Sequence, residues 1–393
     1  MYVSMWSSHS FGMTAGLLWL ALLAVPVPAP AELPVEPIGV VEKLPAHWPD
    51  TWVQAHDTNF RALSDGKVVI FDVAAENRNH KGSIPAGQFA SFIASTTRPE
   101  LYVAETYYSQ RVRGTRHDVI TIHDKTTLAP IAEIPLPGGK RGQYVTYKNT
   151  LQLLNEERWL AVYNFSPAAT VSIIDIAARK IIGEVSIAGC AMIYPTGKRN
   201  FMSLCSEGVM LVSALDENGG VAKQWRTAAF FNADVDPLFA MPTLIGSVAY
   251  FPSFHGDVQP VDLSGDEPKV LKRWSLVADG ERKANWRPGG WQIAGAHGSG
   301  RLYVLMHPDG YNGSHKNGGS EVWVFDVATG KRSARHVLKN WGVSIEVTSG
   351  AKPFLVVTNG DFQLDVYNAD DGKWLRMFGD YVVAMPMVLH AVH

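Results

Sequence analysis

The sequence has little charge, few cysteines and no long apolar run outside its N-terminus. Only 18% of its 393 residues are charged, and 35 Lys and Arg stand against 37 Asp and Glu, for a formal net charge of −2. This balance gives no electrostatic reason to bind nucleic acid or an anionic membrane, so we expect neither as a partner. Because 46% of the residues are hydrophobic, the chain can bury a large core, which excludes a disordered protein.

The N-terminal apolar run predicts export. Residues 14–25 read TAGLLWLALLAV, the length of the hydrophobic region of a signal peptide and too short to cross a bilayer. Ala29-Pro30-Ala31 follows as an A-x-A cleavage signal, although no Lys or Arg precedes the run. We therefore expect residues 1–31 to be a signal peptide cleaved near Ala31. The alternative is a buried core helix.

The two cysteines, Cys190 and Cys205, form an even pair, which in an oxidising compartment is most simply a disulfide. Between them lie two apolar segments joined by the turn-forming residues 195–200, which is typical of a β-hairpin. Centring the turn between Gly197 and Lys198 places the two cysteines opposite each other. We predict a Cys190–Cys205 disulfide. A redox pair and half of a metal site are the alternatives, and both lack C-x-x-C spacing.

A short apolar strand that ends in Asp or a similar residue, followed by a turn and another strand, recurs seven times. The copies are VVIFD (68–72), ITIHD (120–124), VSIID (171–175), VMLVS (209–213), VQPVD (258–262), VWVFD (322–326) and LDVYN (364–368). Their mean spacing of about 49 residues is that of four-stranded propeller blades. We predict an all-β fold, a single seven-bladed β-propeller over residues 32–393. A pair of β-sandwiches is the alternative.

The sequence lacks the signatures of self-sufficient catalysis. It contains no H-E-x-x-H, C-x-x-C-H, P-loop, G-x-G-x-x-G or G-x-S-x-G motif. His297, His307 and His315 come nearest to a cluster, but their spacing indicates no particular metal geometry. We therefore predict no catalytic, cofactor-binding or metal-binding residue in this chain.

Two further features have two interpretations each. Trp286, Trp291 and Trp323 are expected to pack between blades rather than to form a cofactor site. The Gly-rich stretch 309–319 is expected to be a long loop between two strands, which is either a recognition loop or a flexible surface insertion.

Several strings, taken in order, resemble the heavy subunit of the quinoprotein amine dehydrogenases, the family of methylamine and aromatic amine dehydrogenases. They are RGTRHDV (113–119), EIPLP (133–137), SPA (166–168), the segment 190–205 with Phe201-Met202 before its second cysteine, WRPGG (286–290), HPDG (307–310) and HK (315–316). Residues 262–267 and 304–310 look more like the aromatic amine branch, so we lean towards that branch.

The resemblance implies a seven-bladed fold, paired cysteines, a periplasmic location and a non-catalytic role for this chain. In the family, the cofactor tryptophan tryptophylquinone is made from two tryptophans of a separate small, cysteine-rich light subunit, and the subunits assemble as α2β2. The complex oxidises primary amines to aldehyde and ammonia. Its electrons pass to a cupredoxin of the azurin or amicyanin type or to a cytochrome c. The heavy subunit would supply scaffold, channel wall and docking surface.

The resemblance also implies one site. A heavy-subunit Phe lines the substrate channel in this family, and the matching region here is Pro85-Ala86-Gly87-Gln88-Phe89. Either Gln88 or Phe89 takes that position, giving a polar or an apolar wall, unless the aromatic is a core or rim residue without a channel role. Two other functions remain: a standalone periplasmic propeller that binds a ligand or partner without a redox step, and a self-sufficient propeller enzyme such as a lactonase.

Overall fold

The computed structural model describes residues 42–142, 146–380 and 382–392. The chain divides into two units, residues 1–39 and 40–393, and the described residues all belong to the second. The predicted signal peptide, residues 1–31, lies outside them. In the described part, no helix is long and apolar enough to cross a membrane.

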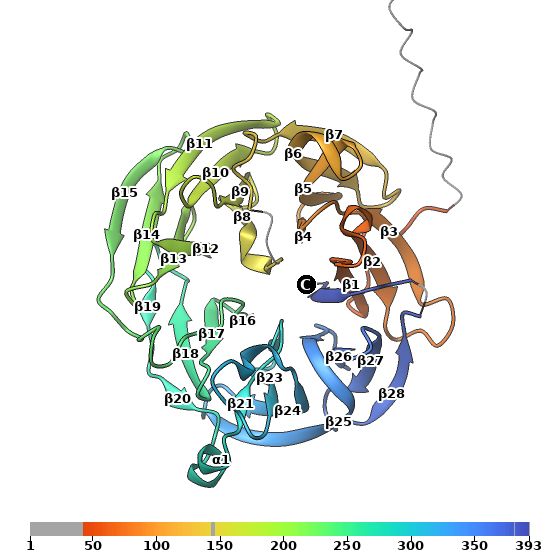
Figure 1. Ribbon diagram of the computed structural model, residues 1–393, viewed down its shortest axis with the longest axis vertical. Coiled ribbons are helices and arrows are strands. Elements are labelled where there is room, and N and C mark those ends of the chain that lie inside the picture. The colour runs from red at the N-terminus through yellow and green to blue at the C-terminus, as the bar shows by residue number, and fades with distance from the viewer. Residues whose placement is uncertain (1–41, 143–145, 381, 393) are drawn as a thin grey trace, which may run out of the picture. The chain divides into compact units, whose positions relative to one another are not determined.

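The second unit is built from antiparallel sheets that stand side by side around a central axis (Figure 1). The first sheet has β29 (Pro386–Ala391), β1 (Trp52–Asp57), β2 (Lys67–Asp72) and β3 (His80–Pro85). The second has β4 (Ser91–Ala94), β5 (Glu100–Gln110), β6 (Arg113–Asp124) and β7 (Pro130–Pro135). The third has β8 (Leu151–Leu154), β9 (Trp159–Asn164), β10 (Thr170–Asp175) and β11 (Lys180–Ser186).

The other half of the ring follows the same order from the axis outwards. The fourth sheet has β12 (Cys190–Thr196), β13 (Asn200–Cys205), β14 (Met210–Leu215) and β15 (Val221–Arg226). The fifth has β16 (Thr243–Ile245), β17 (Val248–Pro252), β18 (Asp257–Asp262), β19 (Lys269–Val270) and β20 (Trp274–Ser275). The sixth has β21 (Arg287–Pro288), β22 (Ala294–His297), β23 (Arg301–His307), β24 (Gly319–Asp326), β25 (Lys331–Val347), β26 (Phe354–Asn359), β27 (Leu364–Asn368) and β28 (Trp374–Phe378).

Short helices occupy some of the connections. They are α1 (Asp279–Lys283) and the 3-10 turns η1 (Leu63–Asp65), η2 (Lys148–Thr150) and η3 (Ser314–Lys316). The architecture is therefore an all-β propeller, as the repeat predicts.

The repeated strings all lie on the third strand counted outwards from the axis. These strands are β2, β6, β10, β14, β18, β24 and β27. The Asp that ends most of them caps the following turn: Asp326 Oδ1 accepts a hydrogen bond from the backbone N–H of Thr329 at 2.9 Å. This is the local bonding that favours Asp at a turn.

The predicted count of seven blades is wrong for the described residues, which form six sheets because the last two repeats share one. Five sheets have four or five strands, the size of one blade, and the sixth has eight: seven in a continuous order from β21 to β28, and β22, which pairs with β23. The cause is β25, which runs for 17 residues without a break. Its first part pairs with β24, and its last part, from Gly342, pairs with β26. The bend at Gly342 changes the partner without ending the strand.

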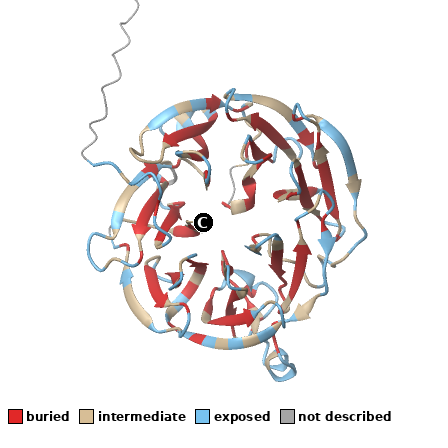
Figure 2. Ribbon diagram, turned by 180° about the vertical axis from the view of Figure 1, so that it is seen from behind, coloured by how far each residue is buried: buried red, intermediate tan, exposed pale blue. Residues whose placement is uncertain are grey.

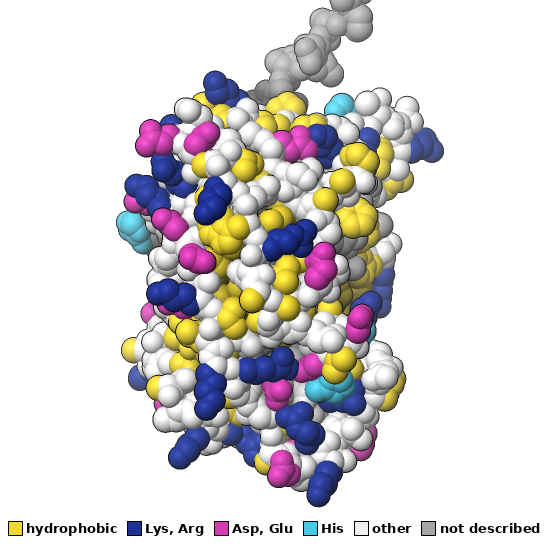
Figure 3. Space-filling view, turned by 90° about the vertical axis from the view of Figure 1, so that its left-hand side faces the viewer, with side chains coloured by type: hydrophobic (Ala, Val, Ile, Leu, Met, Phe, Trp, Pro, Cys, Tyr) yellow, Lys and Arg dark blue, Asp and Glu magenta, His cyan; other side chains and the backbone are white. Residues whose placement is uncertain are grey.

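The core lies between the sheets. Third strands such as β10 are buried along their length, whereas β15, on the outside, is almost entirely exposed, so Figure 2 shows red strands inside and pale blue segments at the rim. One cluster combines Tyr163 and Ile173 of the third sheet with Ile193 and Phe201 of the fourth. On the outer surface seen in Figure 3, cationic and anionic side chains are interspersed, in keeping with the balanced charge.

The chain closes the ring by pairing its last strand with its first. β29 lies innermost in the first sheet and pairs with β1 through Val53–Ala391 and Ala55–Leu389. Asp57, at the end of β1, is fully buried and accepts hydrogen bonds from the backbone N–H groups of Ala384 and Met385 at 2.6 and 2.8 Å. One carboxylate therefore joins residues more than 300 positions apart.

The predicted tryptophan packing is confirmed. The rings of Trp286 and Trp323 have centroids 5.1 Å apart, and the Arg335 guanidinium lies 4.8 Å from each. The ring of Trp291 lies 5.0 Å from that of Tyr147. These side chains fill space between neighbouring strands and loops.

The predicted disulfide is also confirmed: Cys190 and Cys205 are bonded and pair directly across β12 and β13. The predicted centre of the turn, between Gly197 and Lys198, is wrong by half a residue. Thr196 pairs with Asn200, so the turn is centred on Lys198. A bulge near Met192, whose φ is +69°, restores the register at the cysteines. The extra residue of a bulge shifts the pairing of everything beyond it.

We expect Cys190→Ser to lower the free energy of unfolding. The bridge closes a loop of 15 residues. In the chain-entropy model, such a loop contributes about 3 kcal/mol by restricting the unfolded chain. Urea denaturation of the variant and of wild type with and without reductant measures the loss. Wild-type curves that coincide under both conditions would contradict a stabilising bridge.

Candidate functional site

The segment that holds Gln88 and Phe89 is a tight turn between β3 and β4. The backbone N–H of Ala90 donates to the carbonyl of Gly87 at 3.0 Å, and Phe89 has a φ of +46°. A Cβ at Gly87 would lie 2.8 Å from the carbonyl oxygen of Thr106, so only glycine allows this close approach to β5. The turn is therefore built against the second sheet.

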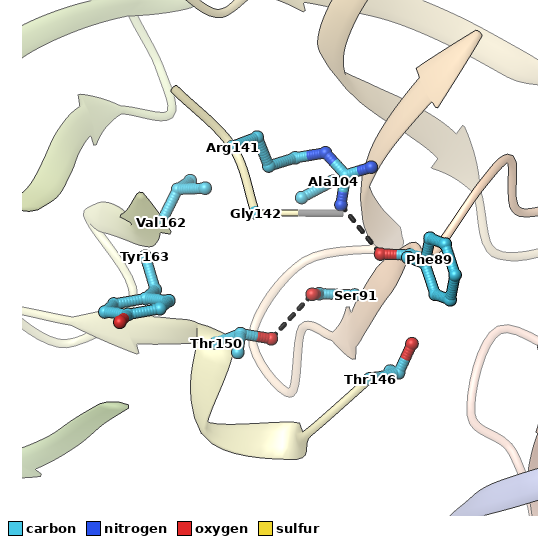
Figure 4. A pocket seen from close by; sticks show the side chains of 9 residues that line it. All are labelled: Phe89, Ser91, Ala104, Arg141, Gly142, Thr146, Thr150, Val162 and Tyr163. Atoms are coloured by element: carbon cyan, nitrogen blue, oxygen red, sulfur yellow. Dashed lines mark hydrogen bonds between the residues drawn. The ribbon is translucent and has the colours of Figure 1, made fainter. Parts of the chain in front are cut away.

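Arg141 holds the backbone of the turn. Its guanidinium donates to the carbonyl oxygens of Phe89 at 2.7 Å and Gln88 at 2.6 Å, the first of which Figure 4 shows. The same group donates to Thr106 Oγ1 at 2.6 Å and lies 3.9 Å from Asp118. The Arg141 side chain is only 3% exposed, so these contacts are made away from bulk water.

Glu105 holds the start of the turn. Its carboxylate accepts hydrogen bonds from the N–H of Gly87 and the hydroxyl of Thr121, both at 2.5 Å. Burial raises the pKa of Glu105, although these hydrogen bonds and the nearby Arg141 act in the opposite direction. The acid is thus committed to the turn rather than free for proton transfer.

A small cavity lies beneath the turn. It has a volume of ≈ 10 Å³, space for about one water molecule. Its lining is Phe89, Ser91, Ala104, Arg141, Gly142, Thr146, Thr150, Val162 and Tyr163 (Figure 4). The hydroxyls of Ser91 and Thr150 are 2.6 Å apart and hydrogen-bonded. This cavity is too small to be a substrate channel within this chain.

The Phe89 ring is half-buried. It packs against Phe60, with ring centroids 5.7 Å apart. The structure thus places Phe89 at the cavity wall, whereas Gln88 does not line that cavity. Whether either residue lines a substrate channel stays a prediction.

The turn belongs to one end of the ring, which we call the Phe89 face. Because adjacent strands run antiparallel, the connections after second and fourth strands leave at the same end. Residues 58–66, 86–90, 111–112, 165–169, 227–242 and 308–318 are among them, together with the bend in β25. Six of the fourteen exposed large apolar side chains among the described residues lie on these connections: Phe60, Val112, Phe165, Val235, Tyr311 and Trp341 are 37 to 64% exposed.

A groove on the Phe89 face separates two of its long loops. Residues 233–239 form one wall, and the Gly-rich stretch, through Asn312, Gly313 and His315, forms another; the groove has a volume of ≈ 390 Å³. Burial lowers the pKa of His315, and Lys316 adds to the effect. The predicted loop between two strands at 309–319 is confirmed, while its role in recognition stays a prediction.

A larger cavity of ≈ 660 Å³ lies among the innermost strands and reaches the opposite end of the ring. Glu346 in its wall pairs with Lys148 and accepts from Gln292 Nε2 at 3.0 Å. Glu157, also in the wall, accepts hydrogen bonds from the hydroxyls of residues 95–97. Both carboxylates are therefore engaged with partners from this chain.

The described residues include no group of three or more His, Cys, Asp and Glu placed to hold a metal ion. His307 does not join His297 and His315 in a cluster; it is buried, and its Nδ1 lies 3.0 Å from the carbonyl of Pro308. Sequence reasoning missed Arg141 and Glu105 altogether. They reach the turn from 52 and 18 residues away, and no local pattern signals such a contact.

Comparison with known proteins places the whole ring in one family. The sequence profile of the methylamine dehydrogenase heavy chain matches residues 56–391. The methylamine dehydrogenase heavy chain of Methylophilus methylotrophus is 26% identical over 327 residues, covering 82% of this chain and 80% of that protein. The heavy chain of Methylorubrum extorquens is 29% identical over 273 residues, covering 69% and 66%.

A solved structure, a functionally unknown protein from Desulfotomaculum acetoxidans DSM 771, matches with a TM-score of 0.57 over 87% of this chain and 98% of that chain. Its 11% identity makes this a likeness of fold alone. The profile match runs from the end of β1 to β29 and includes the turn at Phe89 and Arg141, which binds it. The resemblance found in the sequence is confirmed: the chain belongs to the methylamine dehydrogenase heavy chain family.

Proposed function

We propose that this chain is the non-catalytic heavy subunit of a periplasmic quinoprotein amine dehydrogenase and that its Phe89 face receives the light subunit. The observation that carries the proposal is that six large apolar side chains are exposed on the connections at one end of the ring. Exposed apolar patches on an otherwise polar surface mark contact sites for other proteins. Membership of a heavy-chain family supplies the kind of partner.

The reaction proposed for the complex is the oxidation of a primary amine to an aldehyde and ammonia, with electrons passed to a cupredoxin or a cytochrome c. We assign tryptophan tryptophylquinone to a small, cysteine-rich light subunit, in an α2β2 assembly, as the family resemblance implies.

In this proposal, the ring has seven blades, two of which are fused through β25. The two halves of the eight-stranded sheet each contain one repeat on a third strand. They also pack against each other, since Trp323 and Phe325 of one half share a cluster with Val357 and Tyr367 of the other. Faces of neighbouring blades pack in this way elsewhere in the ring.

The disulfide supports a periplasmic location, because such bonds persist in oxidising compartments. The relatives named above are methylamine dehydrogenase heavy chains. The assignment to the aromatic amine branch therefore rests on residues 262–267 and 304–310 and stays a prediction.

Co-purification tests the proposal. We expect the chain, co-produced with a light-subunit candidate encoded beside it, to elute with that small protein and to carry a quinone-like absorbance. Val235→Asp places a charge on the Phe89 face and should weaken co-elution at least about tenfold, the effect of 1.4 kcal/mol. Val337→Asp is the matched control, because Val337 is 70% exposed on the outer part of β25.

Two results would contradict the proposal. Amine oxidation by this chain purified alone would place the chemistry here. Unchanged co-elution of Val235→Asp would remove the Phe89 face as the docking surface. A colourless chain that binds a ligand or another partner without a redox step would instead support a standalone binding propeller.

A further inference from the structure

The turn at Phe89 has an unfavourable backbone conformation. The hydrogen bond from Ala90 to Gly87 makes it a four-residue turn, with Phe89 in its third position at a φ of +46°. Turns with a positive φ at this position favour Gly or Asn, because a larger side chain is crowded there. A phenylalanine persists in such a conformation only when its surroundings fix it, and such strain clusters at functional sites.

Most backbone N–H and carbonyl groups of the turn have a hydrogen-bond partner in the surrounding residues. The N–H groups of Gly87 and Gln88 donate to the Glu105 carboxylate and to the Thr106 carbonyl. The hydroxyl of Thr146 donates to the carbonyl of Ala90 at 2.9 Å. The two carbonyls between these ends, those of Gln88 and Phe89, both accept from Arg141.

Arg141 is itself held in place. The hydroxyl of Thr106, which accepts from the guanidinium at 2.6 and 3.0 Å, donates to Asp118 Oδ1 at 2.5 Å. Asp118 is fully buried at its side chain and supplies the nearest negative charge. The guanidinium group is planar and charged and can donate to two acceptors at once, so it loses little conformational freedom on binding. A lysine ammonium cannot make the same pair of hydrogen bonds.

We propose that Arg141 is a positioning residue that fixes the Phe89 ring at the docking face and thereby sets the amine-size preference of the complex. Arg141 reaches the carbonyls of the turn, whereas the ring projects to the other side, against Phe60. This inference rests on the proposed function. Its structural half, that Arg141 holds the turn in one conformation, can be measured on this chain alone.

The kinetic test uses the heavy–light complex and two amines, methylamine and phenethylamine. We expect Phe89→Ala to change the ratio of kcat/KM for the two amines about tenfold, since changing the size of a pocket alters discrimination by this order. Arg141→Lys should move the ratio in the same direction about fivefold, mainly through KM. The double variant should show no more than the Phe89→Ala effect, because both act through one ring. Arg158→Lys is the matched control, because Arg158 lies on the β8–β9 turn at the opposite end of the ring and its side chain is 59% exposed.

The structural test labels the isolated chain with fluorophenylalanine and identifies the Phe89 signal by its loss in Phe89→Leu. In fluorine NMR we expect one sharp signal in wild type and in Arg158→Lys, and a shifted or broadened signal in Arg141→Lys. An altered signal together with an altered amine ratio supports the inference. An unchanged signal in Arg141→Lys overturns it.

The two tests separate the inference from the proposed function. If Phe89→Ala moves the amine ratio and Arg141→Lys does not, the positioning role is wrong while the proposed function stands. If no light subunit yields an active complex, the proposed function fails. The amine preference then fails with it, and the fluorine signal alone decides whether Arg141 fixes the turn.

Discussion

Replacing Asp57 with alanine is expected to lower the free energy of unfolding by about 3 to 5 kcal/mol, because three backbone N–H groups lose a buried, charged acceptor. Those donors belong to Asn59, Ala384 and Met385, at 2.9, 2.6 and 2.8 Å. Asp57 lies where β29 joins β1, so the loss falls on the closure of the ring.

Equilibrium unfolding in urea, followed by tryptophan fluorescence, measures this loss. Asp57→Asn should fall between wild type and Asp57→Ala, since an amide offers one acceptor oxygen and turns two donors towards the same N–H groups. Asp65→Ala is the control: its carboxylate is 59% exposed, 3.9 Å from Arg111, and we expect a change within about 0.5 kcal/mol. A loss below about 1 kcal/mol for Asp57→Ala would contradict a role in closure.

The second large effect concerns pH and His56. His56 lies in β1, is 1% exposed, and neither ring nitrogen has a hydrogen-bond partner among the described residues. Burial lowers its pKa from 6.5 to about 4. Between these values, the unfolded chain binds a proton that the folded chain does not, so stability falls as pH falls. The loss relative to pH 8 is about 2 kcal/mol at pH 5 and about 3 kcal/mol at pH 4.

His56→Leu should remove this part of the pH dependence, so that the variant loses less stability than wild type between pH 7 and pH 5. Comparison with wild type is needed because burial also lowers the pKa of His123, His307 and His336. His117→Gln, an exposed histidine on the β5–β6 hairpin, should follow wild type. Parallel pH curves for His56→Leu and wild type would show that His56 does not titrate as inferred.

The sequence predicts the strands well where the pattern is local. The repeated string at 364–368 is β27 to the residue, and those at 68–72 and 171–175 lie within β2 and β10. The paired cysteines were predictable because a hairpin places them by counting along the chain. The turn is centred half a residue away from the predicted place, and the cysteines pair only because a bulge near Met192 shifts the register. No residue type in the sequence signals such a bulge.

The parts that could not be predicted depend on contacts between distant residues. The fused sheet depends on a strand that changes partner at Gly342 instead of ending there. At the candidate site, the sequence pointed to Phe89 through resemblance. The carboxylate and guanidinium that shape its turn come from β5 and from the loop before η2, which only the fold brings together.

The pairing of β29 with β1 has a consequence for the order of events in biosynthesis. β1 is made early, yet its inner neighbour consists of residues 386–391, so the first sheet stays incomplete until nearly all of the polypeptide has been made. Until then, β1 is an unprotected edge, the kind of strand that recruits other chains into aggregates. A nascent or prematurely terminated chain of this protein would therefore depend on chaperones that keep that edge covered.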